Sequence, residues 1–185
     1  LCSVMDLYSR KIVAWTLLSI ASVSGGGKTT IINELSKRLD NSAVLYFDDY
    51  NFDEYIEYGS WLKNGADYNE WDLLPLKIDI DKLIDRKDYI LLDYPFAYKN
   101  KLIGSYIDTA FYIDTPLDAA MARRIFRDMS DASGEQIRKY IEKYIKYERP
   151  LYQYMIDNIM PNSDIVVDGL LPIHDIVDKI MQAFG

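Results

Sequence analysis

Five short runs of aliphatic and β-branched residues recur along the chain, and longer segments with helical periodicity separate them. The runs cover residues 17–21, 43–47, 89–92, 110–113 and 165–167. Such alternation of buried strands with helices is typical of a parallel sheet. The pattern therefore predicts one α/β domain with a five-stranded, mainly parallel sheet.

Three of the predicted helices have recognisable ends. The first begins at the glycines of residues 25–27, runs to about residue 39 and ends at residues 40–41. Thr115 and Pro116 predict the start of a second helix, with Thr115 as the capping hydroxyl and Pro116 at the first helical position. The last covers about residues 173–184. Tyrosines at 140, 144 and 147 recur at helical spacing and predict a packing stripe.

The first 16 residues, LCSVMDLYSRKIVAWT, fit this pattern less well. One interpretation is an extra amphipathic strand. The alternative comes from DLYSRKIVAW, which resembles a strand-turn-strand piece in the integrase-like core of insertion-sequence transposases, over this stretch alone. The chain starts with Leu1 and shows no partner carboxylates for a transposase site. We therefore interpret residues 1–16 as an N-terminal appendage, a fused transposase-like remnant, and residues 17–185 as the working domain.

Composition limits the classes of function. The net charge of −8 argues against nucleic-acid binding, and no apolar run approaches the ~20 residues of a membrane span. A lone Cys2 cannot form an internal disulfide, and without a signal peptide this favours a cytoplasmic location. The single His174 excludes a multi-histidine metal site. An anionic ligand would need a local cationic pocket.

Such a pocket is predicted at IASVSGGGKTT, directly after the first strand. The pattern is the phosphate-binding Walker A loop, G-x-x-x-x-G-K-[ST], with Ser22 in place of the first glycine. Glycines let the backbone N–H groups wrap around phosphate oxygens at the start of a helix. Lys28 supplies charge for the outer phosphates, and Thr29 is placed to ligate Mg²⁺. The predicted ATP contacts in this segment are Ser24, Gly25, Gly26, Gly27, Lys28, Thr29 and Thr30.

Acidic residues follow two other strands, at the sheet edge where ligands of such folds bind. The second strand ends in Asp48 and Asp49, and the third ends in Asp93. If side chains keep alternating along the strand, only one of the first two faces the phosphates. We predict that Asp48 accepts the proton of a substrate hydroxyl and that Asp93 holds Mg²⁺ directly or through water. Asp49 and Tyr50 are predicted to contact the substrate.

The segment TPLDAAMARRIFRDMSD supplies positive charge. On a helical wheel, Arg123, Arg124 and Arg127 share one arc, while the apolar residues, Phe126 among them, fill the packing side. Arginines on a mobile helix suit phosphoryl transfer, because negative charge spreads onto the transferring group. Arg123 is predicted to contact ATP.

Together, SVSGGGKTT, YFDDYNFDE, LLDYPFAY, ARRIFRDMSD and YERPLYQYMIDNIMPNSDIVVDG resemble P-loop kinases of the uridine kinase and nicotinamide riboside kinase type, over about residues 17–185. The resemblance implies a three-layer P-loop NTPase fold with a helical lid. It also implies that Asp48 is the catalytic base, that Asp93 occupies the Walker B position, and that Arg124 and Arg127 are the phosphate-contacting arginines. YNEWD resembles the segment with a ribose-binding aspartate, here Asp72. The lid departs from uridine kinases, which have a further Arg-Gly-Arg where this chain has Asp131–Gly134.

These observations predict an enzyme that uses ATP and Mg²⁺ to phosphorylate a hydroxyl of a nucleoside or similar small metabolite. Its partners would be a nucleoside triphosphate and a small-molecule acceptor, with no nucleic acid and no membrane. A nucleoside monophosphate kinase and a nucleotide-binding regulator without transfer activity remain alternatives. Aromatic residues between the second and third strands are candidates for stacking on a planar base. They are Tyr50, Phe52, Tyr55, Tyr58, Trp61, Tyr68 and Trp71.

Overall fold

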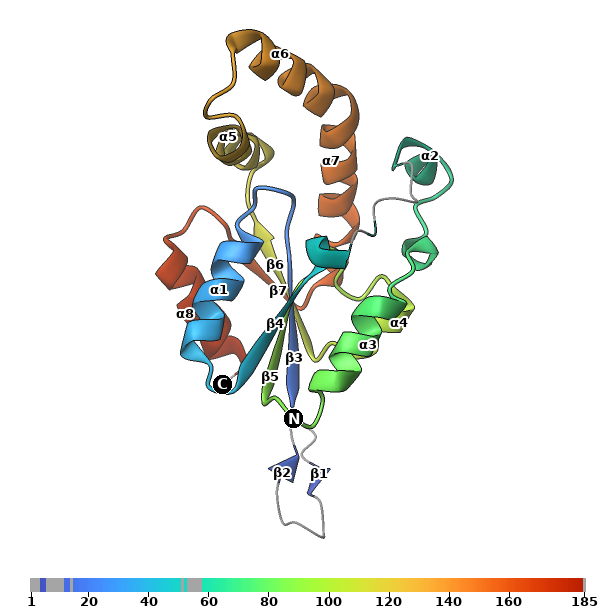
Figure 1. Ribbon diagram of the computed structural model, residues 1–185, viewed down its shortest axis with the longest axis vertical. Helices are drawn as coiled ribbons and strands as arrows, with labels where there is room; N and C mark the ends of the chain where they lie inside the picture. Colours follow the sequence, from blue (N-terminus) through green and yellow to red (C-terminus); the bar gives the residue numbers. More distant parts are fainter. Residues whose placement is uncertain (1–3, 6–11, 14, 51, 53–57, 185) are drawn as a thin grey trace.

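The computed structural model describes residues 4–5, 12–13, 15–50, 52 and 58–184 (Figure 1). The strands are β1 Val4–Met5, β2 Ile12–Val13, β3 Thr16–Ala21, β4 Ser42–Tyr46, β5 Tyr89–Asp93, β6 Thr109–Asp114 and β7 Ile165–Asp168. The α-helices are α1 Lys28–Arg38, α2 Tyr58–Lys63, α3 Leu74–Leu83, α4 Lys101–Gly104, α5 Leu117–Asp128, α6 Gly134–Lys143, α7 Arg149–Asn158 and α8 Ile173–Phe184. Short 3₁₀ turns cover Phe47–Tyr50 (η1), Tyr68–Glu70 (η3) and Met160–Asn162 (η5), and a π-helical turn (η4) covers Tyr144–Glu148. None of the helices in this described part is long and apolar enough to cross a bilayer.

Five strands form one parallel sheet in the order β4-β5-β3-β6-β7, which confirms the predicted fold class. The first strand of the domain, β3, lies in the middle. It pairs with β5 through Ile20 opposite Asp93, and with β6 through Ile20 opposite Phe111. This register places the loop after β3 and the carboxylate that ends β5 at the same edge of the sheet.

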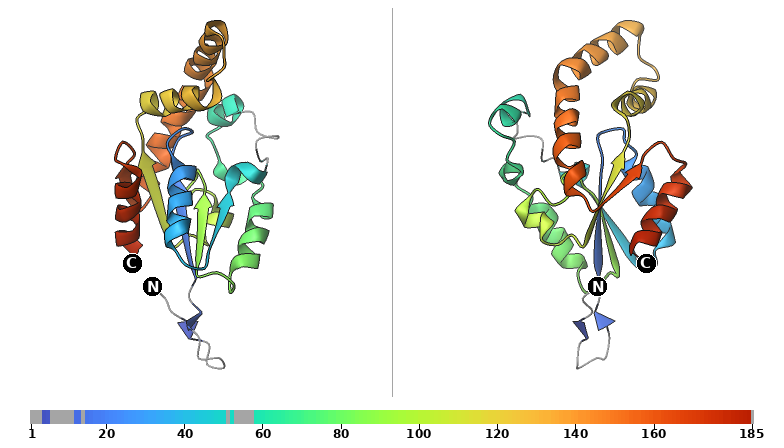
Figure 2. Two further views of the ribbon diagram at one scale, coloured as in Figure 1. Left: turned by 60° about the vertical axis from the view of Figure 1, so that its left-hand side comes forward. Right: turned by 180° about the vertical axis from the view of Figure 1, so that it is seen from behind.

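Alternation along the buried strands divides the core into two layers. On β3, Leu17 and Ala21 face one cluster while Leu18 and Ile20 face the other, and all four are fully buried. Helices α1 and α8 cover one face of the sheet, and α3 lies on the other (Figures 1 and 2). Both faces are thus covered, which explains why the strands read as continuous apolar runs in the sequence.

Helices α5, α6 and α7 rise above the carboxyl ends of the strands (Figure 1). Helix α6 begins with a capping box, in which Ser133 Oγ accepts from the N–H of Gln136 and the Gln136 side chain accepts from the N–H of Ser133. The π-helical turn follows α6 directly and leads into α7, and the chain bends between the two helices (Figure 1). The result is a helical arm placed over the edge of the sheet at which the phosphate loop ends.

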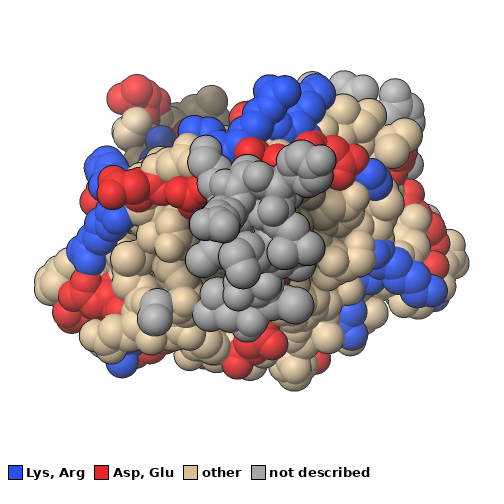
Figure 3. All heavy atoms as spheres, turned by 90° about the horizontal axis from the view of Figure 1, so that it is seen from below, with Lys and Arg blue, Asp and Glu red and all other residues tan. Residues whose placement is uncertain are grey.

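The N-terminal strands β1 and β2 pair only with each other among the described strands, antiparallel, with Val4 opposite Val13. They lie at the end of the molecule opposite the helical arm (Figure 1). Seen from that end, acidic and basic side chains lie next to one another around the visible rim (Figure 3). The proposed appendage of residues 1–16 stays a prediction, and residues 6–11 and 14 of its transposase-like stretch lie outside the described residues.

Candidate active site

The glycine-rich loop connects β3 to α1 with a backbone that most residues cannot adopt. Gly25 and Gly27 have φ angles of 82° and 100°, in the left-handed region. Gly27 is the residue directly before α1, so the loop ends at the helix start with Lys28 as the first helical residue. The first N–H groups of a helix lack partners within it and attract anions. This loop therefore has the geometry of a phosphate cradle.

Ser22, which replaces the first glycine of the motif, fits the entry turn. The side chain is buried, and its Oγ donates to the backbone oxygen of Ile113 on β6 at 2.8 Å. A Cβ added at Gly26 would lie 1.8 Å from this Oγ. The serine therefore anchors the loop to the sheet. Its hydroxyl occupies the space that a side chain at position 26 would need, so position 26 has to be glycine.

Restoring the glycine with Ser22→Gly should lower the free energy of unfolding by about 1–3 kcal/mol, because it removes a buried hydrogen bond and adds backbone freedom. Urea unfolding measures the change. Ser22→Ala, which loses the hydroxyl alone, should account for most of it. Unchanged stability in both variants would contradict the anchoring role.

Three side chains meet where β3 and β5 end. Thr29 Oγ1 donates to Asp93 Oδ2 at 2.6 Å, and Lys28 Nζ lies 3.9 Å from Asp93 Oδ1. Lys28 Nζ also donates to the backbone oxygen of Ser22 at 3.4 Å. The Lys28 side chain is 17% exposed and that of Asp93 is 9% exposed. The structure thus brings together the residues predicted to bind the outer phosphates and the metal.

The electrostatics of this cluster centre on Asp93. Burial raises the pKa of its carboxyl above the usual 3.8, Lys28 and the Thr29 hydrogen bond lower that pKa, and the charges of Asp48 and Asp49 raise it again. The net shift is upward. The ionised carboxylate is therefore less favourable in the folded protein than in the unfolded chain.

Asp93→Asn should consequently increase the free energy of unfolding at pH 7. The pKa of Asp93 is higher in the folded state, so the cost of its charge is present above that folded pKa. The advantage of the asparagine should fade as the pH falls towards about 4, where aspartate is protonated in the unfolded chain as well. Chemical unfolding between pH 4 and 8 tests this, with the exposed Asp131→Asn as a matched control. A loss of stability at pH 7 would show that the carboxylate is net stabilising.

Asp48 and Asp49 do not continue the strand. Strand β4 ends at Tyr46, and both aspartates lie in the 3₁₀ turn η1, so the expected alternation of strand side chains does not apply to them. Both are exposed, and both act on the pKa of Asp93. The structure therefore places two carboxylates near Asp93, and the choice of Asp48 as the base stays a prediction.

Thr115 has a different role from the predicted helix cap. Its hydroxyl donates to the backbone oxygen of Gly26 at 2.9 Å, and α5 begins only at Leu117. A Cβ at Gly169 would lie 1.9 Å from this hydroxyl. Thr115 thus connects the phosphate loop to the end of β6. Because its hydroxyl makes this long-range hydrogen bond, it does not cap α5.

The three arginines of α5 have separate environments. Arg123 Nη2 donates to the backbone oxygen of Gly169 at 3.1 Å, and its Nη1 lies 3.9 Å from the position of a Cβ on Gly27. Arg124 Nη1 donates to Glu148 Oε2 at 2.6 Å. Arg127 pairs with its neighbour Asp128 at 2.6 Å and is 65% exposed. Arg123 and Arg124 therefore lie at the phosphate loop, whereas the contacts of Arg127 are those of a surface residue.

The predicted packing side of α5 is wrong in part. Phe126 is 83% exposed, and the only residue of α5 that is buried within the described chain is Ala120. A Cβ at Gly25 would meet the Ala120 oxygen at 2.3 Å and the Arg124 Cγ at 2.8 Å. The helix contacts the phosphate loop through its backbone and its arginine stem, because it lies above the edge of the sheet and not on the apolar face.

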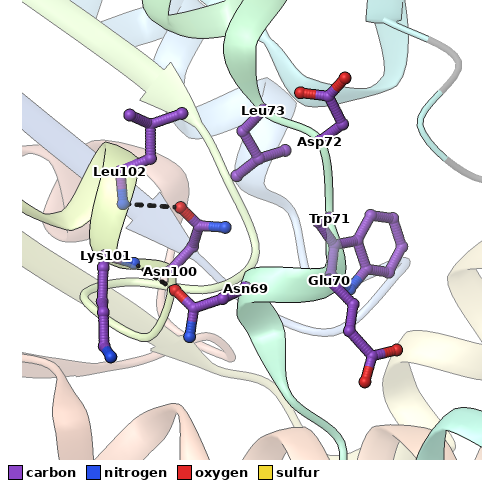
Figure 4. Close-up of a pocket in the computed structure, with 8 residues that line it drawn as sticks. All are labelled: Asn69, Glu70, Trp71, Asp72, Leu73, Asn100, Lys101 and Leu102. Atoms are coloured by element: carbon purple, nitrogen blue, oxygen red, sulfur yellow. Dashed lines mark hydrogen bonds between the residues drawn. The ribbon is translucent and has the colours of Figure 1, made fainter.

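On the side of the predicted acceptor, Asp72 is exposed, and its Oδ1 accepts from the N–H of Leu74 at the start of α3 at 3.2 Å. It lines an open pocket of about 600 Å³ between η3 and α4 (Figure 4). The carboxylates of Asp72 and Glu70 point in opposite directions (Figure 4). The Tyr50 hydroxyl donates to Asp79 Oδ2 at 2.9 Å. Contact of Asp72 and Tyr50 with substrate stays a prediction.

Three of the aromatic residues proposed for stacking belong to the core. Trp61, Tyr68 and Trp71 are only 4–5% exposed and pack against one another, with Trp71 also against Phe47 and Phe96. Trp61 and Tyr68 therefore have little ring surface left for a base, whereas Trp71 lines the pocket beside Asp72, and its stacking role stays a prediction. Tyr50 and Phe52 stack on one another with centroids 5.3 Å apart. The stacking role predicted for Tyr55 lies outside the described residues, as does the Tyr58 side chain.

The parallel sheet, the phosphate loop at its edge and the overlying helical arm define a P-loop kinase. The family model described as "Phosphoribulokinase / Uridine kinase family" matches residues 51–176. The chain belongs to this family, and it is an ATP-dependent small-molecule kinase.

Individual relatives agree with this assignment. A uridine kinase from Staphylococcus aureus (strain JH9) is 29% identical, and the alignment covers 83% of this chain and 87% of the relative. Among solved structures, shikimate kinase from Aquifex aeolicus vf5 has a TM-score of 0.53 at 15% identity, covering 91% of this chain and 95% of that chain. A possible uridine kinase from Bacillus stearothermophilus has a TM-score of 0.52 at 19% identity, covering 86% and 92%. At these identities the structures bear on the fold alone.

The site also contains residues that the sequence did not single out. Glu148 and Tyr152 contact Arg124, and Ile113 receives the Ser22 hydrogen bond. Each is distant in sequence from its partner, and a glutamate or tyrosine on a helix carries no local signal of such a contact.

Proposed function

We propose that this kinase transfers the γ-phosphoryl group of ATP to a hydroxyl of a nucleoside or a similar small metabolite, in a Mg²⁺-dependent reaction. The observation that carries the proposal is the position of Asp48 and Asp49 beside the Thr29–Asp93 pair at the carboxyl edge of the sheet. An acceptor hydroxyl placed there has a carboxylate base and the phosphate loop within the same cluster. The uridine kinase relatives support a nucleoside as the acceptor class.

Each residue of the cluster has a distinct role in the proposal. Lys28 binds the outer phosphates, and Asp48 orients the acceptor hydroxyl and takes its proton. Arg123 binds ATP above the loop, while Arg124 stabilises charge on the transferring group. Arg127 would contribute in the same way only after a rearrangement of its pairing with Asp128.

The residues present fit a magnesium ion. The Thr29 hydroxyl and the Asp93 carboxylate are hard oxygen ligands 2.6 Å apart at the end of the phosphate loop. Mg²⁺ is commonly held by one or two carboxylates together with substrate phosphates. A cation would also favour the ionised form of Asp93, whose pKa burial raises. When bound, the ion would neutralise charge that develops on the phosphates.

The test is a panel of nucleosides, nucleoside monophosphates and vitamin-like ribosides, each incubated with ATP and Mg²⁺ while ADP release is followed. Mass spectrometry of the products identifies a phosphorylated acceptor, and reactions without acceptor measure hydrolysis alone. Turnover with a nucleoside or riboside supports the proposal. Turnover confined to monophosphates would assign a monophosphate kinase, and ADP release that no acceptor stimulates would remove the transfer reaction.

A further inference from the structure

The π-helical turn η4 changes which residues of the helical arm share a face. At about 100° per residue, Tyr140 and Tyr152 of an uninterrupted α-helix would lie about 120° apart. A π-helical turn takes up one extra residue, which reduces this angle to about 20°. The same shift brings Glu148 to within about 20° of Tyr140. The turn therefore gathers these three side chains on one face, and it leaves Tyr147, predicted as part of a packing stripe, 58% exposed.

The side chain that this face meets is Arg124. Its Nη1 donates to Glu148 Oε2 at 2.6 Å and to the Tyr152 hydroxyl at 2.9 Å. Its Cζ lies 5.4 Å from the ring centroid of Tyr140 and 5.7 Å from that of Tyr152. The side chains of Arg124 and Glu148 are 13% and 17% exposed. An ion pair with so little solvent, flanked by two rings, holds the guanidinium in a defined orientation.

The same cluster is joined to the phosphate loop. Ser24 of the loop lies close enough to the Tyr152 hydroxyl to lower its pKa, and the stem of Arg124 packs against Gly25. Burial raises the pKa of Tyr152 to about 12, against the opposing effect of Arg124. The tyrosine is therefore a neutral hydroxyl near pH 7, which accepts from Arg124 Nη1 and donates to Glu148 Oε2.

One edge of the Arg124 guanidinium has no hydrogen-bond partner within the described chain. Glu148 and Tyr152 both bind Nη1, whereas the buried Nε of Arg124 has no hydrogen-bond partner within the described chain. A buried donor without a partner is unfavourable and calls for an explanation. Within the described chain, hydrogen bonds therefore hold the guanidinium from the Nη1 side only.

We propose that Glu148, Tyr140 and Tyr152 are positioning residues that hold Arg124 over the phosphate loop, with Glu148 binding one side of the guanidinium so that the other side stays available to a phosphoryl oxygen. The inference rests on the proposed function, in which Arg124 contacts the transferring group. The π-helical turn is the feature of the backbone that makes the arrangement geometrically available.

A double-mutant cycle tests the proposal. Glu148→Gln keeps the shape of the side chain and removes its charge, and it should lower kcat on the order of ten-fold, because a misplaced catalytic group loses rate steeply. The KM for ATP should change less than about two-fold, since Lys28 and the loop supply most of the binding. In an Arg124→Ala background the same substitution should have no further effect on kcat. Glu148→Asp, which keeps the carboxylate, should recover part of the lost rate.

A matched substitution on α6 serves as the control for Glu148→Gln. Glu142→Gln, an exposed glutamate on α6, should leave kcat unchanged, and circular dichroism checks that every variant is folded. A ten-fold loss that persists in the Arg124→Ala background would show that Glu148 does not act through Arg124. Wild-type kcat in Glu148→Gln would also overturn the proposal.

A second readout does not depend on the acceptor. In ¹⁵N NMR spectra, the Arg124 Nε–H signal, assigned by its absence in Arg124→Lys, should be sharp and slow to exchange in the wild type and broadened in Glu148→Gln. An unaltered signal in Glu148→Gln would overturn the positioning role even if the kinase reaction is established. If the signal is broadened in Glu148→Gln but the wild type phosphorylates no member of the panel, the positioning of Arg124 by Glu148 is supported and the proposed reaction is rejected.

Discussion

Lys28→Ala should reduce kcat by about 10²–10³-fold or more, the range found when a group that stabilises transition-state charge is removed. Lys28 Nζ stands between the loop carbonyl of Ser22 and the carboxylate of Asp93, so it is held where the outer phosphates of a nucleotide would lie. Steady-state kinetics with the best acceptor measures the effect. The affinity for ATP, measured by calorimetry, should fall as well.

Lys37→Ala is the matched control for this substitution. Lys37 lies on the same helix α1 but pairs at the surface with Glu34, and its side chain is 66% exposed. Its removal should leave kcat within about two-fold of the wild type, because exposed ion pairs contribute little. Turnover of Lys28→Ala at the level of this control would show that the loop is not a working nucleotide site.

Asp48→Asn should lower kcat by on the order of 10²-fold or more, as expected for a lost general base, with little change in the affinity for ATP. The substitution preserves size and shape, and the side chain is exposed, so the fold should not change. For a monophosphate kinase the effect should be much smaller, because the acceptor oxygen is already ionised near neutral pH. The measurement therefore separates hydroxyl acceptors from phosphate acceptors.

Asp49→Asn is the necessary comparison, because both aspartates lie in the same 3₁₀ turn and both act on the pKa of Asp93. A loss of kcat confined to Asp49→Asn would mean that Asp49 is the base. Near-normal turnover in both variants would remove the carboxylate-base mechanism and leave transfer by positioning and charge stabilisation alone.

Local patterns were sufficient where the physical cause is local. Apolar runs predicted all five strands of the sheet to within about two residues, and the glycines with Lys28 predicted the phosphate loop and the helix that follows it. Parallel strands place their carboxyl ends at one edge, so the meeting of Thr29 with Asp93 also followed from the order of elements.

Where predictions were wrong, the position of the residue in the folded chain decided the outcome. Thr115 bonds to the phosphate loop in place of capping α5, and Phe126 is exposed because α5 lies above the sheet edge. The alternation expected to distinguish Asp48 from Asp49 ended when β4 gave way to a 3₁₀ turn. These outcomes depend on where the elements end and lie in the fold, which the local pattern does not contain.

The sequence by itself determined the class of fold, the phosphate loop and the residue types that surround it, because periodicity, backbone freedom and charge are properties of short segments. Only the tertiary structure decided that Ser22 is anchored by Ile113 and that Arg124 is clamped by Glu148, 24 positions along the chain. The π-helical turn brings Glu148 and Tyr152 onto the same face of the arm as Tyr140. The tyrosines at 140, 144 and 147 still have the spacing of an ordinary helix, so the local pattern did not predict the turn.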